Sequence, residues 1–428
     1  MRATPLRTMR ATSLLRSIHP VTQGPALTYA LGLSYAAKQS PPFVPSSYQP
    51  GSAGFAGQKT PLGRWVDLMK SLPAGRGELR KTNVEEGQED LSDGGWGIDT
   101  AWQVRKWGAG EDFFAVVDGG NFGRLQRPKI RLISPPSRRG RRTPSRRTRF
   151  PPQLTNPAAR ADFQTHVALS DGVGGWAPDY DPSLYSQALM YHYAKAAQAQ
   201  PSIAPWEGLK KAYAAVEADK HVEAGSATAC AWNLAEDGSA RGVNLGDSGF
   251  SVIRRDDSAF HSSPQTHYFN CPLQLSKIPP KLRGQGVIMD KPEMGEKFEV
   301  KLGSGDVMIL YPKASTLFNE GFVHFSDGLS DNLPMEHVQQ LNTAIGDLLR
   351  SEANVHLTSE ERAHEHARLL ADVLVAAGRN AMTRTGKEEG GKGWKTPFEI
   401  EAKKNGKNWP GGKIDDVCVL VAVANNKI

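Results

Sequence analysis

The chain has 428 residues, which is enough to bury a large core, and 39% hydrophobic and 23% charged residues describe an ordinary water-soluble composition. Its three cysteines, Cys230, Cys271 and Cys418, lie far apart without CxxC spacing, which argues against a disulfide framework or a zinc site and suits a reducing compartment. The net charge of +7 is uneven: twelve of the 52 Lys and Arg, but only two of the 45 Asp and Glu, lie between Val117 and His166.

The N-terminal region has the composition of a targeting segment. Residues 1–66 contain no Asp or Glu, and arginines are interleaved with Ser, Thr and Leu. This pattern predicts a mitochondrial presequence in residues 1–40, removed at a point before Pro61; the alternative is a disordered tail. The apolar run Leu27–Ala37 is too short for a membrane helix, so no stable membrane insertion is predicted. Residues 41–93 are predicted to be a linker, because residues 39–60 are rich in Pro, Gly and Ser.

The folded domain is predicted to span residues 94–428. Short apolar runs predict strands at 113–117, 227–234, 240–255, 297–302, 306–310 and 415–424. Helical periodicity predicts helices at 182–199, 205–222 and 359–382, the first with Asp181 as N-cap and Pro182 at its first position. Strands and helices that do not alternate regularly predict an α+β fold rather than a doubly wound one. Residues 123–163, rich in Pro and Arg and without periodicity, are predicted to be disordered.

Carboxylates recur at the ends of the apolar strands. They are Glu111, Asp112, Asp171, Asp247, Asp327, Asp415 and Asp416. Each one alone is typical of a turn or a cap. If they converge, they repel one another and lose hydration, unless hard cations neutralise them. Oxygen ligands of this kind select Mg²⁺ or Mn²⁺ rather than zinc.

Seven segments carry a resemblance to a known family. In chain order, GED, DGVGGW, GSATA, NLGDSGF, QTHYFNCPLQL, SDGLSDNL and GKIDDVCVLVAV resemble the motifs of the metal-dependent serine/threonine protein phosphatases (PPM, type 2C). The variants GED, DGVGGW and THYFN resemble its mitochondrial branch. The resemblance covers about Gly108 to Ala424, interrupted at residues 123–163 and 311–324. Both interruptions are predicted to be insertions outside the folded domain, or translated non-coding sequence.

The resemblance implies a fold and a reaction. The fold is a four-layer sandwich of two central, mainly antiparallel β-sheets flanked by α-helices, with a binuclear metal site at one end. The reaction is hydrolysis of phosphoserine and phosphothreonine by a hydroxide that bridges two Mg²⁺ or Mn²⁺ ions, without a covalent phosphoenzyme. The implied substrates are phosphorylated proteins of the mitochondrion, in the matrix.

The resemblance also assigns residues. It makes Asp112, Asp171, Asp327, Asp415 and the backbone carbonyl of Gly172 metal ligands, gives Glu111 a metal-bound water, and places Asp247 at an additional, weaker third metal. Asp416 takes a supporting role. Two positions depart from the family: Val173 stands where many members have a histidine, and Trp107 where many have an arginine. These departures leave the general acid and the phosphate clamp unassigned.

Two other functions remain as alternatives. A pseudophosphatase scaffold is compatible with Val173 and Trp107, although the full set of carboxylates argues against it. A nucleic-acid-binding protein would use the basic run Arg138–Arg149, which lacks interleaved aromatic residues and a recognisable reading element. Binding of nucleic acid is therefore not expected, and the oligomeric state is left open.

Overall fold

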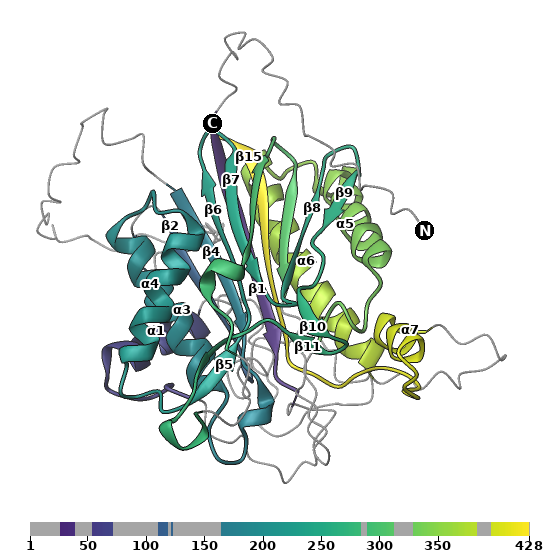
Figure 1. Cartoon of the computed structure of the whole chain (residues 1–428). Coiled ribbons are helices and arrows are strands. Elements are labelled where there is room, and N and C mark those ends of the chain that lie inside the picture. The colour runs from purple at the N-terminus through teal and green to yellow at the C-terminus, as the bar shows by residue number, and fades with distance from the viewer. Residues whose placement is uncertain are drawn as a thin grey trace, which may run out of the picture.

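Two antiparallel β-sheets face each other at the centre of the computed structural model, and helices cover their outer faces (Figure 1). The structure describes residues 26–38, 54–71, 110–118, 121–122, 164–283, 289–311, 328–382 and 395–427. This arrangement confirms the α+β class and the four-layer sandwich expected from the sequence.

The first sheet has five strands in the order β1-β15-β14-β8-β9. They are β1 (Leu27–Ala36), β15 (Val417–Asn426), β14 (Val307–Tyr311), β8 (Gly249–Ile253) and β9 (Ala259–His261). Among the described residues, the ladder joins the first strand to the last, because β1 pairs antiparallel with β15 from Leu27↔Asn426 to Ala36↔Val417.

The second sheet has six strands in the order β13-β7-β6-β4-β2-β3. They are β13 (Glu296–Lys301), β7 (Ser239–Leu245), β6 (Ala229–Ala235), β4 (Gln164–Asp171), β2 (Asp112–Asp118) and β3 (Asn121–Phe122). Two short ribbons lie beside the sheets and pair β10 (Thr266–Tyr268) with β11 (Cys271–Pro272) and β12 (Leu275–Lys277) with β5 (Gly225–Ala227).

Helices on the two outer faces complete the layers. The α-helices are α1 (Pro61–Ser71), α3 (Ser183–Ala199), α4 (Pro205–Ala218), α5 (Met335–Arg350), α6 (Ser359–Met382) and α7 (Pro397–Lys404). The described residues also form the short 3-10 turns η4 (Gly174–Trp176), η5 (Pro280–Leu282), η6 (Pro292–Met294) and η7 (Glu352–Asn354). Helices α3 and α4 contact the second sheet, and α6, with α5 against it, contacts β1 and β15 of the first. No helix among the described residues is long and apolar enough to cross a membrane.

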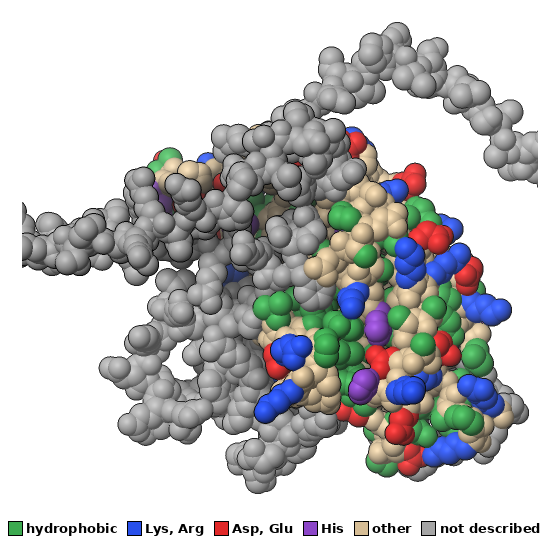
Figure 2. Space-filling model, turned by 90° about the vertical axis from the view of Figure 1, so that its left-hand side faces the viewer, with side chains coloured by type: hydrophobic (Ala, Val, Ile, Leu, Met, Phe, Trp, Pro, Cys, Tyr) green, Lys and Arg blue, Asp and Glu red, His purple; other side chains and the backbone are tan. Residues whose placement is uncertain are grey.

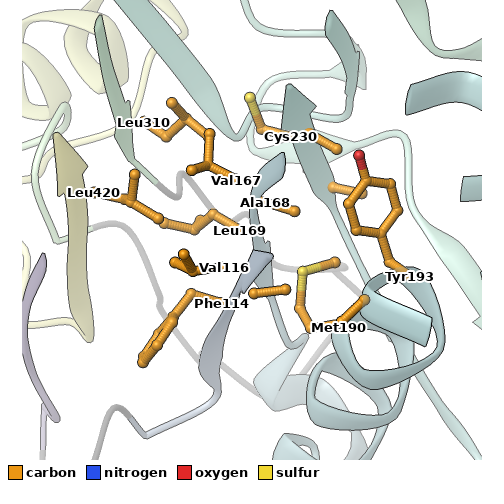
Figure 3. Packing of buried hydrophobic residues seen from close by; sticks show 14 of the residues in the cluster. Phe114, Val116, Val167, Ala168, Leu169, Met190, Tyr193, Cys230, Leu310 and Leu420 are labelled. Atoms are coloured by element: carbon orange, nitrogen blue, oxygen red, sulfur yellow. The ribbon is translucent and has the colours of Figure 1, made fainter. Parts of the chain in front are cut away.

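The alternation of side chains along the central strands builds the core between these layers. Val167 and Leu169 of β4 point toward Leu310 and Leu420 of the opposite sheet, whereas Ala168 faces helix α3 (Figure 3). Because both faces of β4 are covered, its central residues Val167, Ala168 and Leu169 are apolar in succession rather than alternately polar. The strand therefore has little freedom to shift its register, and its last residue, Asp171, is held at a defined place.

The structure corrects the predicted N-terminal boundaries. Residues 27–36, which were assigned to the presequence, form the buried strand β1, and residues 61–71 of the expected linker form helix α1. Helix α6 packs directly on β1, since a Cβ at Gly32 would collide with the carbonyl oxygen of Ala367. The folded domain therefore begins before residue 94. Whether an N-terminal segment is removed stays a prediction.

The predicted insertions lie almost entirely outside the described residues. Residues 123–163 fall outside them, as do residues 312–324 of the second stretch. Tyr311, however, is the last residue of β14, where it is buried and pairs with Gly249 of β8. Tyr311 therefore belongs to the folded domain, and the predicted second insertion begins no earlier than residue 312. On the described part of the face formed by α3 and α4, basic and acidic side chains are interspersed rather than grouped by sign (Figure 2).

Candidate metal centre

Four strand ends bring the predicted carboxylates together. Asp112 is the first residue of β2 and pairs directly with Asp171, the last residue of β4. Asp415 and Asp416 immediately precede β15, and Asp247 follows the end of β7. All five side chains belong to residues that are 3% exposed or less. Strands from both sheets thus deliver acids to one end of the sandwich.

Burial and mutual repulsion disfavour the charged forms of these acids. Burial, followed by the charge of Asp171, raises the pKa of Asp112 well above its usual range. Burial, followed by the charge of Asp247, does the same for Asp171. Burial also raises the pKa of Asp415, although Lys38 and Lys413 oppose it. A cluster that resists ionisation in this way requires added positive charge to become fully anionic.

The carboxylate of Asp112 gives the most direct indication of a cation-binding site. Both of its carboxyl oxygens are inaccessible to solvent and accept no hydrogen bond from any described residue. One oxygen of Asp415 is in the same state, while the other accepts a hydrogen bond from the backbone N–H of Asp416 at 2.7 Å. Buried polar atoms are nearly always paired, and leaving one unpaired costs about 1–3 kcal/mol. The energetic cost of these orphaned oxygens is offset if they bind a cation.

Asp416 holds the surrounding backbone instead. Its Oδ1 accepts a hydrogen bond from the backbone N–H of Lys38 at 2.6 Å, and its Oδ2 accepts one from the N–H of Glu111 at 2.8 Å. Gly110 has a φ of +66°, and a Cβ there would overlap the Asp416 carboxylate. Asp416 therefore ties the end of β1 and the start of β2 to the start of β15, as the supporting role predicted for it requires.

Glu111 faces the same region from the residue before β2. A Cβ at Gly174 would lie 2.8 Å from its Oε2, so the glycine permits the carboxylate to approach the turn η4. The pKa of Glu111 is raised to about 7, first by burial, against the opposing effect of Lys38, and further by Asp416 and Asp181. Asp181 was predicted to be the N-cap of the helix at 182–199, but α3 begins one residue later, with Pro182 as its N-cap. The Oδ1 of Asp181 still accepts hydrogen bonds from the N–H and hydroxyl of Ser183.

Sequence reasoning missed Lys38. Its Nζ lies 2.9 Å from Oε2 of Glu111 and 3.9 Å from Oδ2 of Asp416. Burial alone would lower the pKa of Lys38, but Glu111, Asp416 and Asp415 together raise it above its ordinary value. The residue was overlooked because it follows an apolar run that was assigned to a presequence. The signal that could have found it is a single lysine at the end of a strand-like apolar segment.

The segments next to the remaining expected ligands are fastened to each other. The side chain of Asn332 accepts a hydrogen bond from the N–H of Lys413 and donates one to its carbonyl oxygen, both at 2.8 Å. The fully buried ammonium of Lys413 also lies 3.3 Å from Oδ2 of Asp331. A Cβ at Gly328 would overlap the backbone of Asp416. Residues 328–332 and 411–416 therefore form one unit.

Of the four remaining residues named from the sequence, the structure describes two, Gly172 and Val173. Gly172 lies between Asp171 and the turn η4, and its N–H donates to the carbonyl oxygen of Glu111 at 3.0 Å. Val173 is buried, and its hydrocarbon side chain has no acid or hydrogen-bond donor to offer a substrate. Asp327 and Trp107 lie outside the described residues. The structure thus brings together Glu111 and five of the expected aspartates.

The donor chemistry of this cluster fits hard divalent cations. Within the described ranges, no group of three or more His, Cys, Asp or Glu side chains is arranged to enclose an ion by itself. The buried, unpaired oxygens of Asp112 and Asp415 nevertheless have the properties of cation ligands, because they are anionic oxygen donors shielded from water. Asp171 lies directly opposite Asp112 in the ladder. The thiol of Cys418 interacts electrostatically with Asp112 and Asp171, but burial, followed by these charges, raises its pKa well above its usual range and so disfavours the thiolate that a softer metal would need.

No protein-family model matches the chain, but known proteins are similar to it. The protein phosphatase PTC7 homologue of Homo sapiens is 31% identical over 267 residues, or 60% of this chain and 74% of the relative. That of Danio rerio is 32% identical over 264 residues, or 60% of this chain and 76% of the relative. The 5-azacytidine resistance protein azr1 of Schizosaccharomyces pombe is 31% identical over 267 residues, covering 61% and 77%.

Longer relatives and solved structures are also similar. Probable protein phosphatase 2C 55 of Arabidopsis thaliana is 31% identical over 259 residues, and the match spans 45% of its length, so the chain corresponds to less than half of that protein. Among solved structures, the photosystem II phosphatase PBCP aligns with a TM-score of 0.43 and 25% identity, covering 61% of this chain and 87% of that one.

Proposed function

Because the chain belongs to the metal-dependent protein phosphatases of the PPM (type 2C) family, with PTC7 homologues among its relatives, we propose that it hydrolyses phosphoserine and phosphothreonine in proteins. The observation that carries this proposal is the pairing of Asp112 with Asp171 at the ends of β2 and β4, with the unpaired oxygens of Asp112 and Asp415 buried beside them. Membership of the family supports the reaction class, and the cluster supports the proposed position of the site.

The proposed ligands are Asp112, Asp171, Asp327, Asp415 and the carbonyl of Gly172, with Asp247 at a third, weaker ion. Mg²⁺ or Mn²⁺ bound there would acidify a water molecule and neutralise the phosphoryl oxygens. Asp112 and Asp171 are suited to this role because paired strands fix their backbones, so the two carboxylates need little reorganisation when an ion binds. Glu111, paired with Lys38 and packed against Gly174, is placed to accept a proton from a water molecule.

The substrate phosphate would approach over the turn that follows Asp171. A Cβ at Gly175 would lie no closer than 3.9 Å to any neighbouring atom, so this part of the turn leaves open space beside the cluster. Val173, where the resemblance leads one to expect a histidine, is buried and cannot protonate the leaving alkoxide. We assign that proton to solvent, which suits a serine or threonine leaving group that departs at the exposed side of the centre.

We also propose that the protein acts on phosphoproteins of the mitochondrial matrix. The acid-free composition of residues 1–66 and the resemblance to the mitochondrial branch support this location. Because β1 starts at Leu27 and is part of the core, removal of a presequence must stop before that strand. A reporter protein fused to residues 1–26 would enter mitochondria if this is right, and would stay in the cytosol if it is wrong.

The activity is tested by release of phosphate from a phosphothreonine peptide by the full-length chain. We expect turnover with Mn²⁺, none with a chelator, and a loss of turnover and of Mn²⁺ affinity in Asp171→Asn and Asp327→Asn. Asp179→Asn is the matched control, because Asp179 is exposed and lies on the chain between Asp171 and α3. Thermal melts with and without Mn²⁺ separate lost chemistry from lost folding. Wild-type turnover and Mn²⁺ dependence in Asp171→Asn would refute the proposal.

A further inference from the structure

The position of Lys38 suggests a role that the family assignment does not give it. The residue lies at the end of β1, and its ammonium is in contact with Glu111 and near Asp416. Its side chain is 19% exposed, whereas a typical surface pair of this protein, Lys301 and Asp237, is more than 60% exposed on both sides. A lysine that is withdrawn from water in this way is stable only if nearby anions compensate for the lost hydration.

The backbone around Lys38 is clamped so that the ammonium must face the acids. The buried side chain of Arg379, from α6, donates a hydrogen bond from Nη1 to the carbonyl oxygen of Ala37 at 2.7 Å. On the other side of the peptide, the N–H of Lys38 donates to Asp416. Two buried ionisable side chains from opposite parts of the fold therefore fix the end of β1. The ion pair with Glu111 follows from this backbone placement.

The ion pair between Lys38 and Glu111 affects the stability of the whole acidic cluster. Glu111, Asp112, Asp171, Asp247, Asp415 and Asp416 carry up to six negative charges at one end of the sandwich, with little solvent to screen them. In the metal-free protein, an ammonium in contact with two of these groups offsets part of their mutual repulsion. Once divalent cations are bound, the same ammonium repels them, since charges of like sign now lie close together.

We propose that Lys38 is a built-in counter-ion of the metal-free centre, which helps to keep the unloaded protein folded and lowers its affinity for divalent cations. This inference rests on the proposed metal-binding function. It implies that the site is adjusted to release and rebind its ions as their concentration changes, instead of holding them permanently. Lys38 is a positioning residue in this account, because it acts through Glu111 and Asp416.

The test uses the full-length chain with Lys38→Met, Lys38→Arg and the exposed control Lys301→Met. Each protein is freed of metal by chelation and dialysis, then studied by thermal melting and by calorimetric titration with Mn²⁺. We expect Lys38→Met to melt several degrees lower than wild type without metal, to gain more from saturating Mn²⁺, and to bind Mn²⁺ about tenfold more tightly. Lys38→Arg keeps the charge and should stay near wild type, as should Lys301→Met.

A second substitution, at Glu111, distinguishes an effect of the Lys38 charge on the melting temperature from an effect of its packing. Glu111→Gln removes the anion that Lys38 contacts, so combining it with Lys38→Met should restore the metal-free melting temperature that Lys38→Met alone loses. If the lysine matters only for packing, the double variant melts at or below the single one and the inference is overturned. Unchanged or weaker Mn²⁺ binding by Lys38→Met overturns it as well. If wild type itself binds no Mn²⁺, the proposed function fails, whereas the rescue still decides the counter-ion role.

Discussion

Deleting residues 1–37 should prevent the protein from folding, because that deletion removes the whole of β1. The strand makes a ten-residue ladder with β15 and buries Leu27, Leu33 and Tyr35, each 7% exposed or less. Burial of side chains of this size stabilises a protein by about 1.5–3 kcal/mol each, so these three account for roughly 5–9 kcal/mol. Because the entire stability of a domain is about 5–15 kcal/mol, the loss removes most or all of it.

The assay is urea unfolding followed by circular dichroism, with a deletion of residues 1–25 as the matched control. The shorter deletion removes only residues before the first described one and should leave the unfolding midpoint unchanged. Gly32→Ala tests the same strand without truncation, because the added Cβ collides with the backbone of α6 at Ala367. A protein without residues 1–37 that unfolds cooperatively at the wild-type midpoint would refute the assignment of β1 to the core.

Three further substitutions give separate checks. Burial lowers the pKa of His166 to about 4, whereas the same side chain in the unfolded protein binds a proton near pH 6.5. The free energy of unfolding should therefore fall by about 2 kcal/mol as the pH is lowered from 6.5 to 5. Urea midpoints across this range should depend less on pH in His166→Gln; an identical slope would contradict the reasoning. Asn332→Ala leaves the N–H and carbonyl of Lys413 without their partner, so we expect about 2–3 kcal/mol lower stability and weaker Mn²⁺ binding by calorimetry. Wild-type Mn²⁺ affinity in that variant would show that the two segments need not be joined. Gly110→Ala should cost about 1–2 kcal/mol from its positive φ alone, and more from the clash with Asp416, measured as a lower thermal midpoint; an unchanged midpoint would count against it.

Sequence patterns predicted those elements best whose periodicity or caps are local. Helix α6 was predicted with the bounds that the structure has, and α3 and α4 were predicted within a few residues. The strand pattern from β6 to β8 and the last strand were also found, because apolar runs between Gly and Asp turns are distinctive. The α+β class followed from the order of these elements.

Elements whose identity depends on distant partners were missed. β1 resembles a targeting segment by composition, and only its pairing with a strand almost 400 residues later makes it a core strand. For the same reason, Lys38 could not be connected with Glu111, since no local pattern joins them. The carboxylates were found because each lies at the beginning or the end of a strand within its own segment. Asp416 was given the right kind of role, but the two N–H groups that it binds were not predictable.

The pairing of β1 with β15 also determines when the chain can fold during its synthesis. Asn426, the partner of Leu27, is added to the chain 399 residues after it, so this sheet cannot close on the ribosome before β15 has been made. Contacts between such distant segments form slowly, because a long loop must close before they can stabilise the fold. A chain terminated anywhere before Val417 would keep the apolar surface of β1 and β14 exposed. Prematurely ended products should therefore be substrates for chaperones and proteases rather than partly active enzymes.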